Sequence, residues 1–336
     1  MRRWLPPVAV LSLLLVGCSA DPAPDSGVTG GETDESATVH AVAAVYPLAW
    51  MAEQVAPEAE VELLNQGSQE AHDIQITPQQ RSAIETADVV LYLGEIDYQP
   101  QVEDAVAAAG GEVVSAAEAA GEEALLPASA DPHAHEEEAG TEDEHGHEEE
   151  SATEDEQGGG EAGVDPHMWF DPAIMADVAD EVAEAFAAAD PDSAETYRDN
   201  AAQVREDLTT LDEDLEATLG GQCRLDEAIV SHAAYGYLLQ PHGKSQHALT
   251  NVGAEGDASA AELGEIVGEI RAEGITHVLA EPVEGRDAAE TVAREAGVEL
   301  LEIVPLDAVT DEQAATGLPD LVREQADAFA TALDCA

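Results

Sequence analysis

Strand-like and helix-like segments alternate along this chain, on both sides of a long stretch without apolar periodicity. In the first half, buried-type runs such as VHAVAAV and DVVLYLG alternate with helical segments, one of which opens with Thr77 and Pro78, the chemistry of a helix start. The alternation returns in the second half, from EAIVSH to a final helix at 318–334. Strands that alternate with helices predict parallel sheets. We therefore expect two parallel-sheet α/β lobes.

The region between the two halves combines a spacer with two long helices. Residues 127–163 are dominated by Glu, Asp, His, Gly and Ala and cannot bury a core. Asp171 then caps a helix whose apolar residues recur at steps of four, and a second helix follows as far as Gly220. The predicted domains are an N-terminal lobe at 39–170 that contains this loop, a linking helix at 171–190 and a C-terminal lobe at 191–336.

Residues 1–18 have the pattern of an export signal. Arg2 and Arg3 precede an apolar stretch that is too short to span a membrane as a mature helix, and the stretch ends in LVGC. LVGC resembles a bacterial lipobox, in which Cys18 is acylated and becomes the new N-terminus. Ordinary secretory cleavage is the alternative. With residues 19–38 as a flexible tether, we expect a lipid-anchored protein on the extracytoplasmic face of the bacterial cell membrane.

The two remaining cysteines, Cys223 and Cys335, have one possible intramolecular pairing. Thiols outside the cytoplasm are readily oxidised, so we predict a disulfide between them. It would fasten the C-terminal helix to the strand that begins near Asp226.

The charge balance excludes nucleic acid as a partner. The chain has 73 acidic and 11 basic side chains, a formal net charge of −62. Such a surface repels a polyanion and offers no basic patch that could release its counterions. The acidic surplus reflects either life in salt or a compositional bias toward Ala and Glu, and the sequence leaves both readings open.

Three histidines stand where a predicted strand or loop gives way to the next element. His72 follows the strand VELLNQ, His167 precedes the helix at 171, and His232 ends the strand EAIVSH. In α/β folds, ligands bind in the crevice at the carboxyl ends of the strands. Three imidazoles and one oxygen ligand suit tetrahedral Zn²⁺, so the sequence raises the hypothesis of a shared metal site between the lobes. The other histidines outside the acidic loop are expected to be ordinary core or surface residues: His40, His242, His247 and His277.

Several longer motifs occur in a fixed order: AVYPLAWMAEQVA, GSQEAHDIQITPQQRSAIETADVVLYLG, DPHMWFDP, IVSHAAYGYLLQPHG, HVLAEP and LEIVPLDAVTDEQ. From Val39 to the C-terminus the chain resembles the zinc/manganese solute-binding lipoproteins of ABC importers. The resemblance implies two α/β lobes joined by one rigid helix, with a metal between them. It makes His72, His167 and His232 the ligands. Asp165 and Asp171 would then be acceptors that set the tautomer of His167.

The fourth ligand is where this chain departs from the family pattern. Many members place an Asp before the PL of the last strand, but Val304 stands here. Others carry an acidic residue after PL, a position that Asp307 occupies. The resemblance therefore favours Asp307 as the fourth ligand, with Glu281 of the AEP motif as a supporting group or a substitute. Water is a further alternative.

The resemblance favours Zn²⁺ over Mn²⁺, because manganese sites prefer more carboxylate ligands. The His-rich acidic loop is a feature of the zinc branch, and its two H-x-H pairs are expected to add weak zinc sites. A solvated spacer is the alternative. The loop histidines concerned are His133, His135, His145 and His147.

The expected function is capture of Zn²⁺ outside the cytoplasm and its delivery to an ABC importer, whose permease and ATPase are separate chains. We expect a monomer that is not an enzyme. A manganese-binding homologue is one alternative, and a secreted zinc hydrolase is another, because three histidines with an open position also describe a catalytic zinc site. The sequence contains neither H-E-x-x-H nor G-x-S-x-G.

Overall fold

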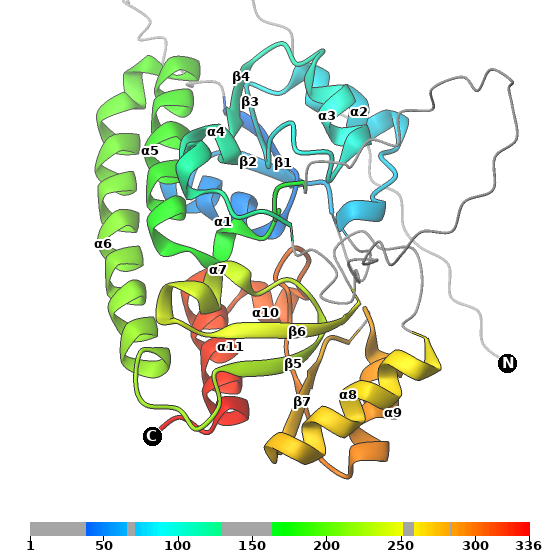
Figure 1. Ribbon diagram of the computed structural model, residues 1–336. Helices are drawn as coiled ribbons and strands as arrows, with labels where there is room; N and C mark the ends of the chain where they lie inside the picture. The colour runs from blue at the N-terminus through cyan, green and yellow to red at the C-terminus, as the bar shows by residue number, and fades with distance from the viewer. Residues whose placement is uncertain (1–37, 66–70, 129–162, 251–258, 283) are drawn as a thin grey trace, which may run out of the picture. The chain divides into compact units, whose positions relative to one another are not determined.

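The structure is a computed structural model, and it describes residues 38–65, 71–128, 163–250, 259–282 and 284–336 (Figure 1). Within these residues no helix combines the length and the apolar character that a membrane crossing requires.

Two parallel sheets organise the chain. Each has four strands, with the orders β2-β1-β3-β4 and β6-β5-β7-β8. All the pairings between neighbouring strands are parallel, as the alternation of strands and helices predicts. The fold class of two parallel-sheet α/β lobes is therefore confirmed. The strands are β1 (His40–Ala43), β2 (Glu60–Leu63), β3 (Val89–Tyr92), β4 (Glu112–Ser115), β5 (Glu227–His232), β6 (Ser245–Thr250), β7 (His277–Ala280) and β8 (Glu299–Glu302).

Local sequence chemistry sets the helix starts of the N-terminal lobe. Thr77 accepts a hydrogen bond from the amide of Gln80, and the Gln80 side chain accepts one from the amide of Thr77, which completes a capping box before Pro78. The helices of this lobe are α1 (Tyr46–Val55), α2 (Pro78–Thr86), α3 (Pro100–Val106) and α4 (Ala116–Ala120), with short 3-10 turns η1 (Ala71–Asp73), η2 (Glu122–Ala124) and η3 (Met168–Phe170).

Two long helices, α5 (Pro172–Ala189) and α6 (Ala194–Leu219), follow one another through the turn η4 (Pro191–Ser193) and lie side by side (Figure 1). Helix α5 packs on β3 and β4 of the first sheet, whereas α6 contacts both α1 and α11 (Leu318–Leu333). Helix α6 thus contacts elements of both lobes. The domain boundaries remain predictions.

Strand β6 and helix α8 (Ala260–Glu273) of the C-terminal lobe are elements that the sequence pattern does not predict. The strand β6 has a short, mixed sequence, SQHALT, and α8 contains Gly264 and Gly268, which lower its helix propensity. Ser259 nonetheless starts α8 with a capping box. The full set of helices in this lobe is α7 (Gly236–Leu239), η5 (Gln240–His242), α8 (Ala260–Glu273), α9 (Arg286–Ala296), α10 (Asp311–Ala314) and α11 (Leu318–Leu333).

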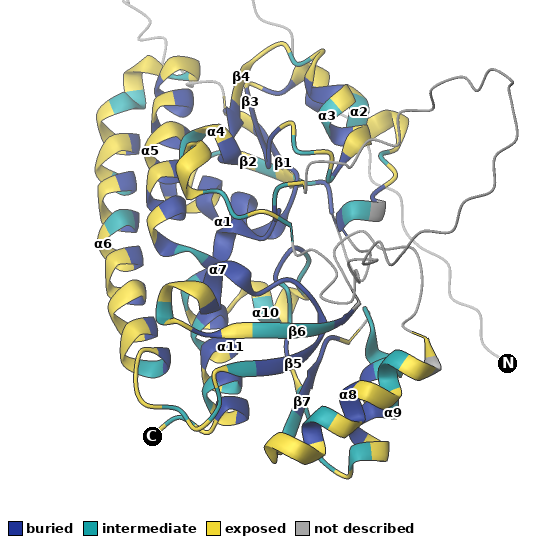
Figure 2. Cartoon of the chain, viewed as in Figure 1, coloured by how far each residue is buried: buried dark blue, intermediate teal, exposed yellow. Residues whose placement is uncertain are grey.

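Each sheet has one face in a shared core and the other in a core of its own. The largest buried cluster contains Leu91 of the first sheet, Val230 of the second and the inner faces of α1, α5, α6 and α11 (Figure 2). A smaller cluster lies between the first sheet and α2 and α3. Another lies between the second sheet and α8 and α9.

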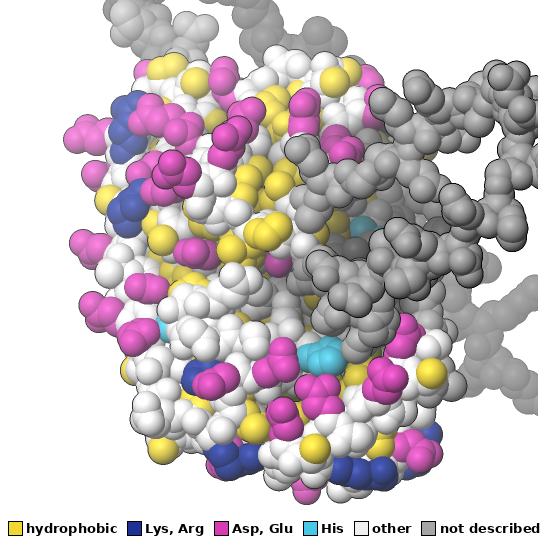
Figure 3. Space-filling model, viewed as in Figure 1, with side chains coloured by type: hydrophobic (Ala, Val, Ile, Leu, Met, Phe, Trp, Pro, Cys, Tyr) yellow, Lys and Arg dark blue, Asp and Glu magenta, His cyan; other side chains and the backbone are white. Residues whose placement is uncertain are grey.

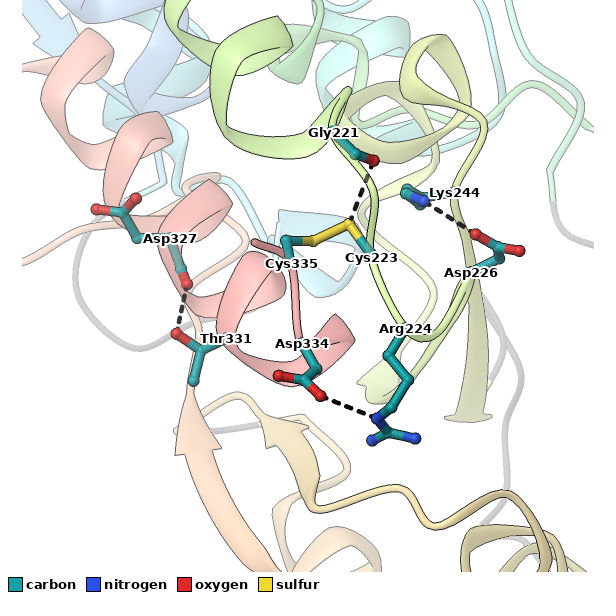
Figure 4. Close-up of a disulfide and its surroundings, with 9 residues drawn as sticks. All are labelled: Gly221, Cys223, Arg224, Asp226, Lys244, Asp327, Thr331, Asp334 and Cys335. Atoms are coloured by element: carbon teal, nitrogen blue, oxygen red, sulfur yellow. Dashed lines mark hydrogen bonds and ion pairs between the residues drawn. A yellow bond between two sulfur atoms is a disulfide. The ribbon is translucent and has the colours of Figure 1, made fainter.

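The predicted disulfide is confirmed: Cys223, just before β5, is bonded to Cys335, just after α11 (Figure 4). Beside it, Arg224 donates hydrogen bonds to Asp334 and to the carbonyl oxygens of Glu273 and Gly274. The bridge therefore joins the C-terminal helix to the start of the second sheet.

Candidate metal centre

His167 is the residue before η3, the turn that leads to α5, and its side chain is buried. Its Nδ1 is 2.8 Å from Oδ1 of Asp165, another buried residue. A carboxylate only accepts hydrogen bonds, so Nδ1 carries the proton and Nε2 keeps a lone pair. In the part of the chain that the structure describes, this buried Nε2 has no hydrogen-bond partner. Such a nitrogen is suited to bind a cation.

Neighbouring residues hold in place Asp165 and the turn η3, which follows His167. The Tyr237 hydroxyl donates to the carbonyl of Asp165 at 3.2 Å. A Cβ at Gly236 would lie 3.0 Å from Asp165 Oδ2, so a glycine there gives this carboxylate its room. Trp169 Nε1 donates to the carbonyl of Pro305 at 2.8 Å, which ties η3 to the segment after β8. These contacts account for the Trp of DPHMWFDP and for the YGY of the later motif.

His232 is the last residue of β5, and it is also buried. Its Nδ1 is 3.3 Å from Glu281, which follows β7, and 3.3 Å from Glu284. The hydroxyl of Tyr235 donates to Glu281 at 3.0 Å, and the amide of Glu281 donates to Ser231 Oγ. No hydrogen bond reaches Nδ1 of His232 in the described residues, so this buried nitrogen is also open to a cation.

The carboxylates change the acidity of His232. Burial lowers the pKa of its imidazole, but Glu281 and Glu284 outweigh burial and raise it to about 9. The metal-free imidazole is therefore protonated at neutral pH.

The rings of the three predicted histidines lie in one row. His232 is next to His167, and Tyr98 lies between His167 and His72. The ring centroids of His167 and His232 lie 5.1 Å apart. Tyr98 lies 5.9 Å from His167 and 6.2 Å from His72, which belongs to η1. Burial raises the pKa of Tyr98 well above its usual range, and nearby carboxylates, Asp307 foremost, raise it further. The hydroxyl stays neutral, in a region where acidic groups favour a cation.

Asp307 connects the C-terminal lobe to the residue before His72. Its Oδ2 accepts the amide of Ala71 at 3.0 Å, and the Gln99 side chain donates to the carbonyl of Ala71 at 3.1 Å. Burial raises the pKa of Asp307. Asp307 is thus buried and in direct contact with the segment that carries His72.

The backbone before Asp307 has an uncommon conformation. Leu306 has a φ of 67°, in the left-handed region that a branched side chain seldom adopts. The carbonyl of Asp307 accepts hydrogen bonds from the amide of Tyr46 at 3.1 Å and from the side chain of Asn65 at 3.5 Å. The turn after β8 is therefore held against the N-terminal lobe by several contacts.

The other predicted site residues either have a different role or lie outside the described residues. Asp171 caps α5 by accepting hydrogen bonds from the amides of Ala173 and Ile174, and Asp165 is the carboxylate that contacts the His167 ring in the described residues. Four predicted loop positions and the lipidation position lie outside the described residues: His133, His135, His145, His147 and Cys18.

Glu284 is a residue of this centre that sequence reasoning missed. It follows Glu281 by three residues and stands before Gly285, which has a φ of +64°. A Cβ at Gly285 would lie 2.7 Å from the carbonyl oxygen of Ser231. The E-x-x-E-G pattern after a strand was the available signal, because only glycine lets this loop approach β5 so closely.

The donor set suits a borderline divalent cation. Ligand atoms of His232, Glu281 and Glu284 all lie within 4.8 Å of one another. Imidazole nitrogens backed by carboxylates are the usual arrangement around protein-bound zinc. Acidic side chains are also scattered over the molecular face in Figure 3, which has few Lys or Arg.

The chain is similar to one family of known proteins. Residues 41–332 match the family described as "ZnuA: Zinc-uptake complex component A periplasmic". A zinc-binding lipoprotein named AdcA from Streptococcus pneumoniae is 27% identical over 314 residues, which are 92% of this chain and 56% of that protein. The chain thus spans about half the length of the streptococcal relatives. The high-affinity zinc uptake system protein ZnuA from Bacillus subtilis is 25% identical over 339 residues, 99% of this chain and 98% of that one.

Solved structures share the fold. The zinc-bound ZnuA-like domain of Streptococcus pneumoniae AdcA superposes with a TM-score of 0.66 at 23% identity, over 89% of this chain and 100% of that domain. A crystal structure of ZnuA gives a TM-score of 0.69 at 20% identity, over 88% of this chain and 99% of the other. At these identities the likeness concerns the fold.

Proposed function

This chain belongs to the ZnuA family of zinc-uptake components, and we propose that it captures Zn²⁺ outside the cytoplasm and delivers it to an ABC importer. The observation that carries the proposal is the buried Nε2 of His167, which has no hydrogen-bond partner in the described residues while Asp165 holds the opposite ring nitrogen. Since the family consists of solute-binding transport proteins, the chain acts as a carrier rather than as an enzyme.

In this proposal His72, His167 and His232 supply imidazole ligands, and His167 binds through Nε2. Asp165 orients the His167 ring by accepting from Nδ1. Glu281 lies 3.3 Å from Nδ1 of His232. Asp307 completes the site as an oxygen ligand. Its support is its burial, its electrostatic effect on His232 and its contact with Ala71 beside His72.

Delivery requires an importer permease and a separate ATPase, with this chain as a monomeric carrier. The ligands come from both lobes, so a movement of one lobe against the other would break the donor set and release the ion. The His-rich loop at 127–163 would add weak capture sites through its H-x-H pairs.

The experiment that tests the proposal is a competitive chelator titration of the chain that lacks residues 1–18. We expect one tightly bound Zn²⁺ per chain and weaker retention of Mn²⁺, because imidazole donors favour zinc and Mn²⁺ lies low in the divalent affinity series. Tighter binding of Mn²⁺ would support the manganese alternative, and the absence of any tight metal would refute the proposal. Hydrolytic activity of the zinc-loaded protein would favour the hydrolase alternative.

Zinc affinity should fall as pH decreases below about 9, the pKa of metal-free His232. Zinc requires the unprotonated imidazole, so binding at pH 7 releases the proton of His232. One competing proton weakens binding about tenfold per pH unit, or about a hundredfold between pH 9 and pH 7. Calorimetry in buffers of different ionisation enthalpy measures this proton release. No release at pH 7 would show that His232 is already neutral.

We propose that Cys18 anchors the chain to the membrane. The Cys18→Ala variant should leave the membrane fraction or remain unprocessed, because the acylated residue is absent. Incorporation of labelled fatty acid, followed by fractionation, measures the effect. Wild-type protein that takes up no label would contradict the anchor.

A further inference from the structure

A second group of metal-ligating side chains lies on the C-terminal lobe, away from the centre described above. Glu227 begins β5, His247 lies in β6 and Glu269 lies in α8. One ligand atom from each lies within 4.8 Å of the other two. Glu227 and His232 are at opposite ends of β5, about 16 Å apart along the strand.

The strand register explains why these residues meet. His247 pairs with Ile229, and Ile229 is buried in the core between the second sheet and helices α8 and α9. Side chains two residues apart on a strand share a face, so Glu227 lies on the same face as Ile229. Helix α8 buries Ile266 and Ile270 in that core, and Glu269 directly precedes Ile270 on this helix.

The spacing of the ligand atoms fits a small cation. His247 Nδ1 and Glu269 Oε2 are 3.4 Å apart. Two ligands of a tetrahedral zinc ion with bonds of about 2.0–2.1 Å lie about 3.3 Å from each other. Imidazole and carboxylate are both ligand types that zinc accepts, and water could complete this donor set.

The exposure and charge of this group differ from those of simple His–Glu pairs on the surface. Side-chain exposure is 11% for His247 and 30% for Glu269, whereas the Glu partner of His277 is 85% exposed. Neither Glu227 nor Glu269 forms an ion pair with Lys or Arg in the described ranges. The group contains two carboxylates, whose negative charges a divalent cation would balance.

We propose that Glu227, His247 and Glu269 form a second, weaker Zn²⁺ site that ties α8 to the edge of the second sheet. Its ligands come from three elements, so the bound ion would stabilise the C-terminal lobe. The site does not depend on the metal centre between the lobes.

The test compares zinc binding of the mature wild-type chain with that of His247→Gln, Glu269→Gln and the control His277→Gln. The control removes a histidine from a strand of the same lobe that has one Glu partner. We expect equilibrium dialysis to show one fewer weakly bound Zn²⁺ in His247→Gln and Glu269→Gln, while the tight ion is retained. The control should keep the full number.

The second readout is thermal unfolding with zinc added beyond the first equivalent. The wild type and the control should gain a few degrees in Tm, because an ion bound only by the folded state stabilises it. His247→Gln and Glu269→Gln should lose this gain. Equal zinc numbers and equal Tm gains in all four proteins would overturn the proposal and leave an ion-pair cluster. Absence of a tightly bound Zn²⁺ in the wild type would instead contradict the metal centre between the lobes.

Discussion

Replacing His167 with alanine should lower the zinc affinity of this protein by about a hundredfold to a thousandfold. Structural zinc sites with four ligands supply about 10–16 kcal/mol, so each ligand accounts for about 2.5–4 kcal/mol. His167 is buried, its Nε2 has no partner in the described residues, and water cannot reproduce a neutral imidazole donor there. A zinc competition titration against a chelator of known affinity measures the loss.

The companion variants form a graded series. His72→Ala and His232→Ala should resemble His167→Ala, and Asp307→Ala should cost less, because water replaces an oxygen ligand more readily than an imidazole. Asp165→Asn should weaken binding by about 10–100-fold, since it alters the acceptor that holds the His167 ring.

The control for the series is His277→Ala, which should bind zinc as the wild type does. If Glu281→Ala strongly lowers the zinc affinity and Asp307→Ala leaves it unchanged, Glu281 is the fourth ligand. Three histidine variants with wild-type affinity would eliminate the proposed centre altogether.

Removing the disulfide should lower the free energy of unfolding by about 4–5 kcal/mol. Cys223 and Cys335 are 112 residues apart, and a crosslink that closes so long a loop restricts the unfolded chain strongly. The double variant Cys223→Ser/Cys335→Ser should therefore unfold at a lower denaturant concentration. Denaturant titration followed by circular dichroism measures the change.

Zinc affinity provides the control for that variant. The bridge lies before β5, whereas His232 ends this strand, so the folded double variant should keep its tight zinc. An unfolding free energy equal to that of the oxidised wild type would show that the crosslink adds no stability. A loss of zinc binding in the folded variant would show that it also shapes the metal centre.

The sequence alone determined the parts of this protein that depend on local chemistry and on order along the chain. Alternating strands and helices predicted two parallel lobes, because parallel strands need crossover helices. Thr77 with Pro78 predicted the start of α2, and Asp171 with Pro172 predicted the start of α5, because helix caps act within one turn. The disulfide followed from the single pairing open to two exported cysteines.

The carboxylates around the histidines were decided only by the tertiary structure. Asp165 and Asp171 stand on either side of His167 in sequence, yet one contacts its ring and the other caps a helix. Glu284 reaches His232 because Gly285 allows a close approach of two loops.

The sequence pattern likewise did not predict the contacts between distant segments. Asp307 accepts from Ala71 across 236 positions of the chain. His247 meets Glu227 and Glu269 through strand register and the packing of α8, an element that the sequence pattern did not predict. Such side-chain contacts depend on how whole elements pack, and neither composition nor spacing carries that information.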